Sequence, residues 1–194
     1  MDTLEADELD RADMRRLAAG HAAALDDLME RHAPRVFHFL YRMLNNEQDA
    51  NDVAQDTFVR IFRAHGSYQP VHRFSTWLYT IAGNLARDHL RWRSRRPDVS
   101  LTAESGTSEQ TLGDLLPAET ATPAQKAEAS ERTRAVRAAV QRLPDDLREA
   151  IVLCEWEDLA LAEAAAVLQT TPKAVESRLY RARQLLRERL KGWL

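Results

Sequence analysis

The sequence predicts an all-α fold of two small helical domains joined by a flexible linker, the C-terminal domain being a helix-turn-helix. Apolar residues recur at helical spacing on both sides of residues 97–123, whereas the alternating β-branched runs that predict strands are missing. Residues 97–123 hold three prolines, two glycines and eight Ser or Thr, without a sustained helical or strand period. This composition is typical of a linker.

The charge of the chain is divided into blocks. The 194 residues carry a formal net charge of −3, which by itself does not indicate a protein that binds nucleic acid. The net charge is −6 over residues 1–30, +6 over 31–96, −6 over 97–131 and +3 over 132–194. Such alternation indicates that the acidic and basic segments have different partners.

The composition excludes several classes of protein. No apolar run approaches the roughly 18 residues of a membrane helix, and the acidic start does not resemble a signal peptide, so we expect a cytoplasmic protein. The single Cys154 has no partner for an intrachain disulfide, and the Cys and His residues lack the spacing of metal ligands. We therefore expect no metal site and no cofactor.

The first domain is expected to span residues 25–96, after an acidic segment, residues 1–24, that forms either an arm or a helix. A helix over about residues 49–64 places its apolar residues, including Phe62, on one stripe. Its other face carries Asp52, Gln55, Asp56 and Val59. Two aspartates at i, i+4 repel each other by about 0.2–0.5 kcal/mol, which the helix N-terminus offsets in a benign acidic turn. The polar and apolar neighbours favour a partner surface instead, and no nucleophile or metal cluster indicates catalysis.

A second helix is expected to begin near Ser75 as its N-cap. In the loop before it, Tyr68 and Phe74 have weaker claims to the core than the aromatic residues on helical stripes. Residues 87–96 hold five arginines, more than a favourable interaction with a helix C-terminus requires, so phosphate neutralisation is the better interpretation. Aromatic rings beside arginines suit unpaired bases, because stacking contributes about 1–3 kcal/mol per base.

An acidic linker over residues 97–131 is expected to precede a second domain over residues 132–194. Its helices are expected at residues 146–155, 159–168 and 172–190, with Thr171 as the cap and Pro172 at the first position of the last helix. A short helix, a tight turn and a longer basic helix form a helix-turn-helix. The outward face of the last helix suits the DNA major groove, but an ordinary helical bundle explains the same spacing equally well.

Three segments resemble the extracytoplasmic-function (ECF) class of bacterial RNA polymerase sigma factors, group 4 of the sigma-70 family. Residues 49–58 (DANDVAQDTF) are similar to the family's helix for binding core polymerase. Residues 74–84 (FSTWLYTIAGN) are similar to its promoter-melting segment, and residues 174–183 (AVESRLYRAR) to its recognition helix. The order of the segments, with a linker between the last two, makes the resemblance specific.

The resemblance implies a role for each of these surfaces, with sigma region 2 over residues 25–96 and sigma region 4 over residues 132–194. Core RNA polymerase would contact Asp52, Gln55, Asp56 and Val59. The melted strand of the minus-ten promoter element would contact Tyr68, Phe74, Trp77, Asn84, Arg87, Arg91 and Arg93. The minus-thirty-five element would contact Thr171, Lys173, Glu176, Ser177, Arg178 and Arg181. An anti-sigma factor would be a further partner.

The helix-turn-helix departs from the family's usual pattern. Ala160 stands where a capping serine is common, with Asp158 as its substitute, and Gln169 stands where the turn usually has glycine. Glu176 replaces a frequent lysine, and its carboxylate would repel phosphate but accept a hydrogen bond from cytosine.

The leading hypothesis is a non-enzymatic sigma factor that joins core RNA polymerase, recognises a two-part promoter and promotes its melting. The alternative is a free-standing helix-turn-helix regulator, which has no need for an aromatic, arginine-rich surface in its first domain. An all-helical enzyme has little support, because the sequence holds no catalytic constellation.

Overall fold

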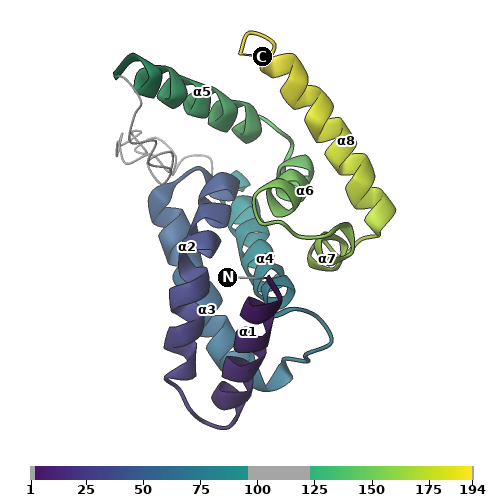
Figure 1. Cartoon of the computed structure of the whole chain (residues 1–194). Coiled ribbons are helices and arrows are strands. Elements are labelled where there is room, and N and C mark those ends of the chain that lie inside the picture. The colour runs from purple at the N-terminus through teal and green to yellow at the C-terminus, as the bar shows by residue number, and fades with distance from the viewer. Residues whose placement is uncertain (1–2, 96–122, 194) are drawn as a thin grey trace.

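The computed structural model describes residues 3–95 and 123–193, and every regular element within these ranges is a helix (Figure 1). In chain order the elements are α1 (Thr3–Ala18), α2 (Ala24–Leu44), α3 (Glu47–Ala64), the 3-10 helix η1 (His65–Ser67), α4 (Phe74–Ser94), α5 (Pro123–Gln141), α6 (Asp145–Glu155), α7 (Leu161–Val167) and α8 (Pro172–Arg189). The all-α fold class is confirmed. None of the described helices is long and apolar enough to cross a membrane.

The N-terminal helices pack around a core drawn mainly from α2, α3 and α4. Phe39, Phe58 and Leu78 are among its buried side chains. A tight turn joins α2 to α3, in which Asn45 has a left-handed φ of 53° and the Asn46 side chain accepts a hydrogen bond from the Asp49 backbone N–H (2.9 Å). Asparagine suits both the end of one helix and the cap of the next. The turn therefore folds α3 back along α2.

The acidic N-terminal segment forms a helix, which decides between the two alternatives left open by the sequence. Asp10 and Asp13 of α1 are buried, and both accept hydrogen bonds from Arg31 of α2 (3.0 and 2.6 Å). Asp10 also pairs with His32 (2.8 Å). These contacts fix α1 to α2. The buried carboxylates of α1 are therefore partnered within the domain.

The helix-turn-helix is formed by α7 and α8. The Thr171 side chain accepts a hydrogen bond from the Ala174 backbone N–H (3.2 Å) and Pro172 opens α8, so both features predicted at this helix start are confirmed. Gln169 in the turn has φ of 50°, a left-handed conformation that costs a residue with a Cβ about 1–2 kcal/mol and is free for glycine.

Two expected caps and one boundary of the predicted linker differ in the structure. At α7, the N-cap is Ala160, whose backbone N–H donates to Glu163 (2.9 Å), whereas the carboxylate of Asp158 pairs with Arg35 (3.3 Å) and does not cap the helix. At α4, the helix begins at Phe74, which places Ser75 inside it.

The third difference concerns the predicted linker, residues 97–131. Helix α5 begins at Pro123 and so extends into that segment, while residues 96–122 lie outside the described part of the chain. Residues 124–131 are rich in Ala, Gln, Lys and Glu, which favour helix, and proline suits the first helical position. The helix-favouring residues after Pro123 therefore determine the structure of this segment. The linker prediction had counted Pro123 as a sign of a loop.

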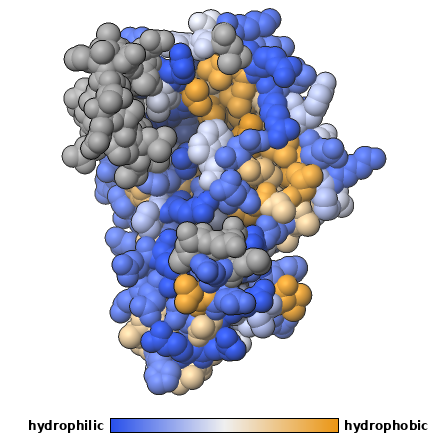
Figure 2. All heavy atoms as spheres, in the orientation of Figure 1, coloured by the Kyte–Doolittle hydropathy of each residue, from blue (hydrophilic) through white to orange (hydrophobic). Residues whose placement is uncertain are grey.

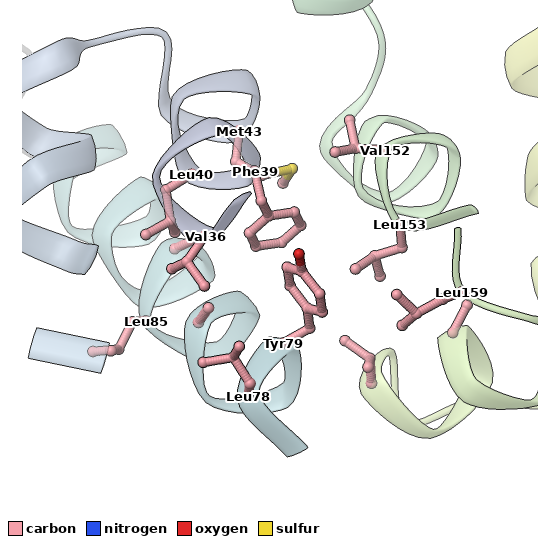
Figure 3. Close-up of a cluster of buried hydrophobic side chains, with 14 of the residues drawn as sticks. Val36, Phe39, Leu40, Met43, Leu78, Tyr79, Leu85, Val152, Leu153 and Leu159 are labelled. Atoms are coloured by element: carbon pink, nitrogen blue, oxygen red, sulfur yellow. The ribbon is translucent and has the colours of Figure 1, made fainter. Parts of the chain in front are cut away.

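A continuous apolar cluster joins the N-terminal and C-terminal helices (Figure 3). Phe39 of α2 and Tyr79 of α4 meet edge to face, with 5.2 Å between their ring centroids. Val152 and Leu153 of α6, together with Leu159, face these two rings. The packing of α6 against α2 and of α7 against α4, with Glu149 of α6 reaching Arg87 of α4, is called the closed arrangement below.

We expect Thr171→Ala to lower the free energy of unfolding by about 1 kcal/mol, because it removes the side-chain acceptor at the start of α8. Thr171→Ser keeps that acceptor and serves as the matched control. Chemical denaturation of the full chain, followed by circular dichroism, measures both variants. Equal losses in the two variants would contradict the capping role.

Candidate nucleic-acid and partner interfaces

The exposed face of α3 carries all four residues expected to contact a partner. Asp52, Gln55, Asp56 and Val59 are exposed, whereas the intervening Val53, Ala54, Thr57 and Phe58 are buried. Two consecutive turns thus present two carboxylates, an amide and an apolar side chain on one face. Phe62, expected on the buried stripe, is 43% exposed and lies one turn after Val59. The sequence prediction was wrong for Phe62, and the face is more apolar than expected.

The aromatic residues near the start of α4 form a cluster of tilted and edge-to-face rings, with Phe74 as its buried member. Phe74 is 0% exposed, because the start of α4 turns its ring into the core against His32, with 5.1 Å between ring centroids. The expectation that Phe74 is weakly packed and available to a base is therefore wrong. Tyr68 and Trp77 are half-buried and contact each other (5.2 Å between centroids), so they are the solvent-accessible members of this cluster.

The polar face of α4 brings together Asn84, Arg87 and Arg91, but carboxylates hold both arginines. Arg87 donates to the Asn84 side chain (2.6 Å) and to Glu149 of α6. Arg91 donates to Asp88 one turn earlier (2.5 Å). Arg93 lies 3.9 Å from Asp49 of α3. The face is thus basic by composition, and the most buried of these ion pairs is made with the C-terminal domain.

The outward face of α8 is open to solvent. Lys173, Glu176, Ser177 and Arg181 are exposed, and Thr171 is exposed while capping the helix. Arg178 is half-buried, with Nε 3.7 Å from Asp146. Tyr180, which the spacing turns outward, is 65% exposed and adds an aromatic ring to this face. Helix α8 therefore presents cationic, hydroxyl, carboxylate and aromatic groups along one side, as major-groove readout requires.

Two buried carboxylates between the domains were not found by sequence reasoning. Glu149 and Glu157 are 3% and 6% exposed. Glu157 accepts a hydrogen bond from the Tyr79 hydroxyl (2.5 Å) and lies 3.5 Å from Arg35 and 3.6 Å from Arg42. A glutamate on an amphipathic segment is expected to face solvent. The burial of Glu149 and Glu157 becomes visible only when their partners on α2 and α4 are known.

Comparison with known proteins decides the family. Residues 28–96 match the model of sigma-70 region 2, and residues 133–186 match that of sigma-70 region 4. The RNA polymerase sigma-H factor of Pseudomonas aeruginosa is 35% identical, over 96% of this chain and 96% of that protein. The ECF RNA polymerase sigma factor SigW of Bacillus subtilis is 31% identical, over 92% of this chain and 95% of SigW. The chain belongs to the extracytoplasmic-function class of sigma factors.

Solved structures support the fold of this sigma factor. CnrH, in complex with the cytosolic domain of CnrY, has a TM-score of 0.70 at 28% identity, covering 95% of this chain and 98% of CnrH. RpoE of Bartonella quintana, in complex with the anti-sigma factor NepR, has a TM-score of 0.67 at 24% identity and shares the fold.

The two buried carboxylates couple the closed arrangement of the sigma factor to pH. Burial raises the pKa of Glu149 and of Glu157, and the arginines near each of them oppose that rise. The groups facing Glu149 are Arg87, Arg178 and Asp145, and those facing Glu157 are Tyr79, Arg35 and Arg42. A carboxyl pKa that is higher in the closed arrangement than in water means that the closed arrangement binds more protons.

We therefore expect the closed arrangement to strengthen as the pH falls toward these raised pKa values and to weaken as the pH rises through them. Small-angle X-ray scattering of the full chain at about pH 5 and about pH 8 should give the smaller radius of gyration at the lower pH. The double variant Glu149→Gln with Glu157→Gln cannot titrate and should remove the difference. A radius that responds to pH equally in both proteins would refute this coupling.

Proposed function

We propose that this sigma factor joins core RNA polymerase through the exposed face of α3 and carries it to a two-part promoter. The observation that carries the proposal is the side-by-side exposure of Asp52, Gln55, Asp56 and Val59, in a segment that resembles the family's polymerase-binding helix. The work is done by binding energy and not by bond chemistry. Its place of action is the cytoplasm, where polymerase meets DNA.

The two DNA-binding surfaces that we assign lie in different domains. In region 2, over residues 25–96, the exposed ring surfaces of Tyr68 and Trp77 stack on bases of the melted minus-ten strand, while Asn84, Arg87, Arg91 and Arg93 contact its backbone and base edges. Helix α8 in region 4 reads the minus-thirty-five element with Lys173, Glu176, Ser177, Arg178 and Arg181. Thr171 contributes by fixing the start of that helix.

An anti-sigma factor is a further partner that we assign to this chain. Figure 2 shows apolar surface between α5 and α8, facing the viewer. A hollow between these two elements is lined by Ala135, Glu131 and Arg134 of α5 and by Trp193 after α8, and Trp193 is 43% exposed. The solved structure of CnrH likewise contains a second protein, the cytosolic domain of CnrY. Apolar surface of this kind marks protein interaction sites.

The proposed function is tested by transcription from a promoter library with purified core polymerase. We expect initiation at a restricted set of library sequences that share two elements. We expect Asp52→Arg with Asp56→Arg to lower core association at least about tenfold, because each change replaces a carboxylate with a cation on the binding face. The variant should retain specific binding of duplex DNA by α8.

Each failure in this experiment has a distinct meaning. Absence of both core binding and promoter-specific initiation by the unmodified chain would refute the sigma-factor role. Specific DNA binding without core binding would instead support a free-standing helix-turn-helix regulator. Wild-type core affinity in the double arginine variant would reject the assigned α3 face alone.

For the minus-thirty-five contact, we expect Arg181→Ala to weaken binding of the selected duplex by about 1–3 kcal/mol, as loss of a base contact does. Arg183→Ala is the matched control, because Arg183 lies on the same helix but its side chain donates to Glu155 within the domain (2.5 Å). Fluorescence anisotropy with the library-selected duplex and its point variants measures both. Equal effects of the two substitutions would reject base readout by Arg181.

A further inference from the structure

Glycine at position 83 allows the two domains to meet closely. Gly83 lies in the middle of α4 and is buried, and a Cβ placed there would lie 2.7 Å from a carboxylate oxygen of Glu149. Any other residue would therefore displace that carboxylate from its position over the helix. Glycine in a helix interior costs about 0.5–1 kcal/mol of stability relative to alanine. At position 83 this loss accompanies the close approach of Glu149.

The carboxylate seated over Gly83 holds Arg87. Glu149 accepts a hydrogen bond from Arg87, whose other terminal nitrogen donates to Asn84 (2.6 Å). The groove beside this pair is lined by Asn84, Arg87, Leu90, Arg91 and Ser94 of α4 and by Asp145, Asp146 and Glu149 of α6. The acidic start of α6 thus faces the polar side of α4. The Glu149 carboxylate occupies the position at Arg87 that a DNA phosphate would take.

A second contact fixes the same two domains without using a residue assigned to DNA. Glu157, which follows α6, is inserted between α2 and α4, where the Tyr79 hydroxyl and the guanidinium groups of Arg35 and Arg42 surround it. Only 2% of its side chain is exposed. Opening the domains would return Glu157, Arg35 and Arg42 to water and leave the proposed DNA-binding residues unchanged.

We propose that α6 is an intramolecular inhibitor of promoter binding, in which Glu149 occupies Arg87 over Gly83 and Glu157 holds the domains closed. The inhibition rests on the proposed role of α4 in binding the minus-ten strand. In the closed arrangement the α3 face is exposed, so polymerase docks on the closed chain while the α4 surface is still masked. A chain that is open about one-tenth of the time binds DNA about tenfold more weakly than a fully open one.

The test compares the full chain with Glu149→Ala, Glu157→Ala and the double variant. Glu155→Ala is the matched control, because Glu155 also lies on α6 but pairs with Arg183 inside its own domain. Small-angle X-ray scattering reports opening, and anisotropy with a labelled single-stranded DNA pool of randomised sequence reports the α4 surface. Gly83→Leu displaces the Glu149 carboxylate without removing a charge, and only its radius of gyration is measured.

We expect the double variant and Gly83→Leu to enlarge the radius of gyration, and the double variant to bind the DNA pool at least about fivefold more tightly than Glu155→Ala. Circular dichroism confirms the helices. Should the alanine pair lose helical signal, Arg35→Ala with Arg42→Ala, which leaves Glu157 without its cationic partners, replaces it in both measurements.

Two outcomes overturn the inhibitor role. Unchanged radii in all variants would show that these contacts do not hold the domains together. A larger radius with unchanged DNA affinity would show that closure does not mask Arg87. Both outcomes leave the proposed function standing, because that function fails only when the unmodified chain neither binds core polymerase nor initiates from the promoter library.

Discussion

The middle of helix α6 is buried on every side, and the other helices have to enclose it. Residues 147–153 are buried without interruption, which requires neighbouring elements around the whole circumference of the helix. Helices α7 and α8 cover it from its own domain, α2 covers it from the other domain, and α4 reaches it through the pair of Arg87 and Glu149. Because the buried run includes Arg148 and Glu149, the neighbours also have to pair two charges. An uncompensated buried charge costs about 3–5 kcal/mol.

The two charges are paired in different ways, and only one pairing affects the DNA surface. Arg148 donates to the backbone oxygens of Met43, Gln141 and Leu143, each at 2.9 Å, and so joins the end of α2 to α6 through backbone carbonyl groups. Glu149 instead accepts a hydrogen bond from Arg87, a cation on the proposed DNA-binding face. The stability of the closed arrangement and the proposed contact with promoter DNA therefore use the same guanidinium group.

Local sequence patterns predicted the features that one helix decides alone. The exposed face of α3 follows from helical spacing, and the Thr171 cap follows from the residue types around one helix start. The missed features depend on partners distant in sequence: Glu149 meets a residue 62 positions away, and Glu157 one 78 positions away. Phe74 was misjudged for the same reason, because its burial depends on α2 and not on its position in a loop.

The competition for Arg87 also gives the closed arrangement a defined dependence on salt. Binding of DNA releases condensed counterions, so its affinity falls steeply as the salt concentration rises. The pair of Arg87 and Glu149 is mostly buried, with side-chain exposures of 29% and 4%, and salt screens buried pairs much less than exposed ones. Rising salt therefore weakens the DNA contact more than the internal one and shifts Arg87 toward Glu149. Linkage makes the coupling reciprocal: a partner that separates the domains raises DNA affinity by the same factor by which DNA favours separation.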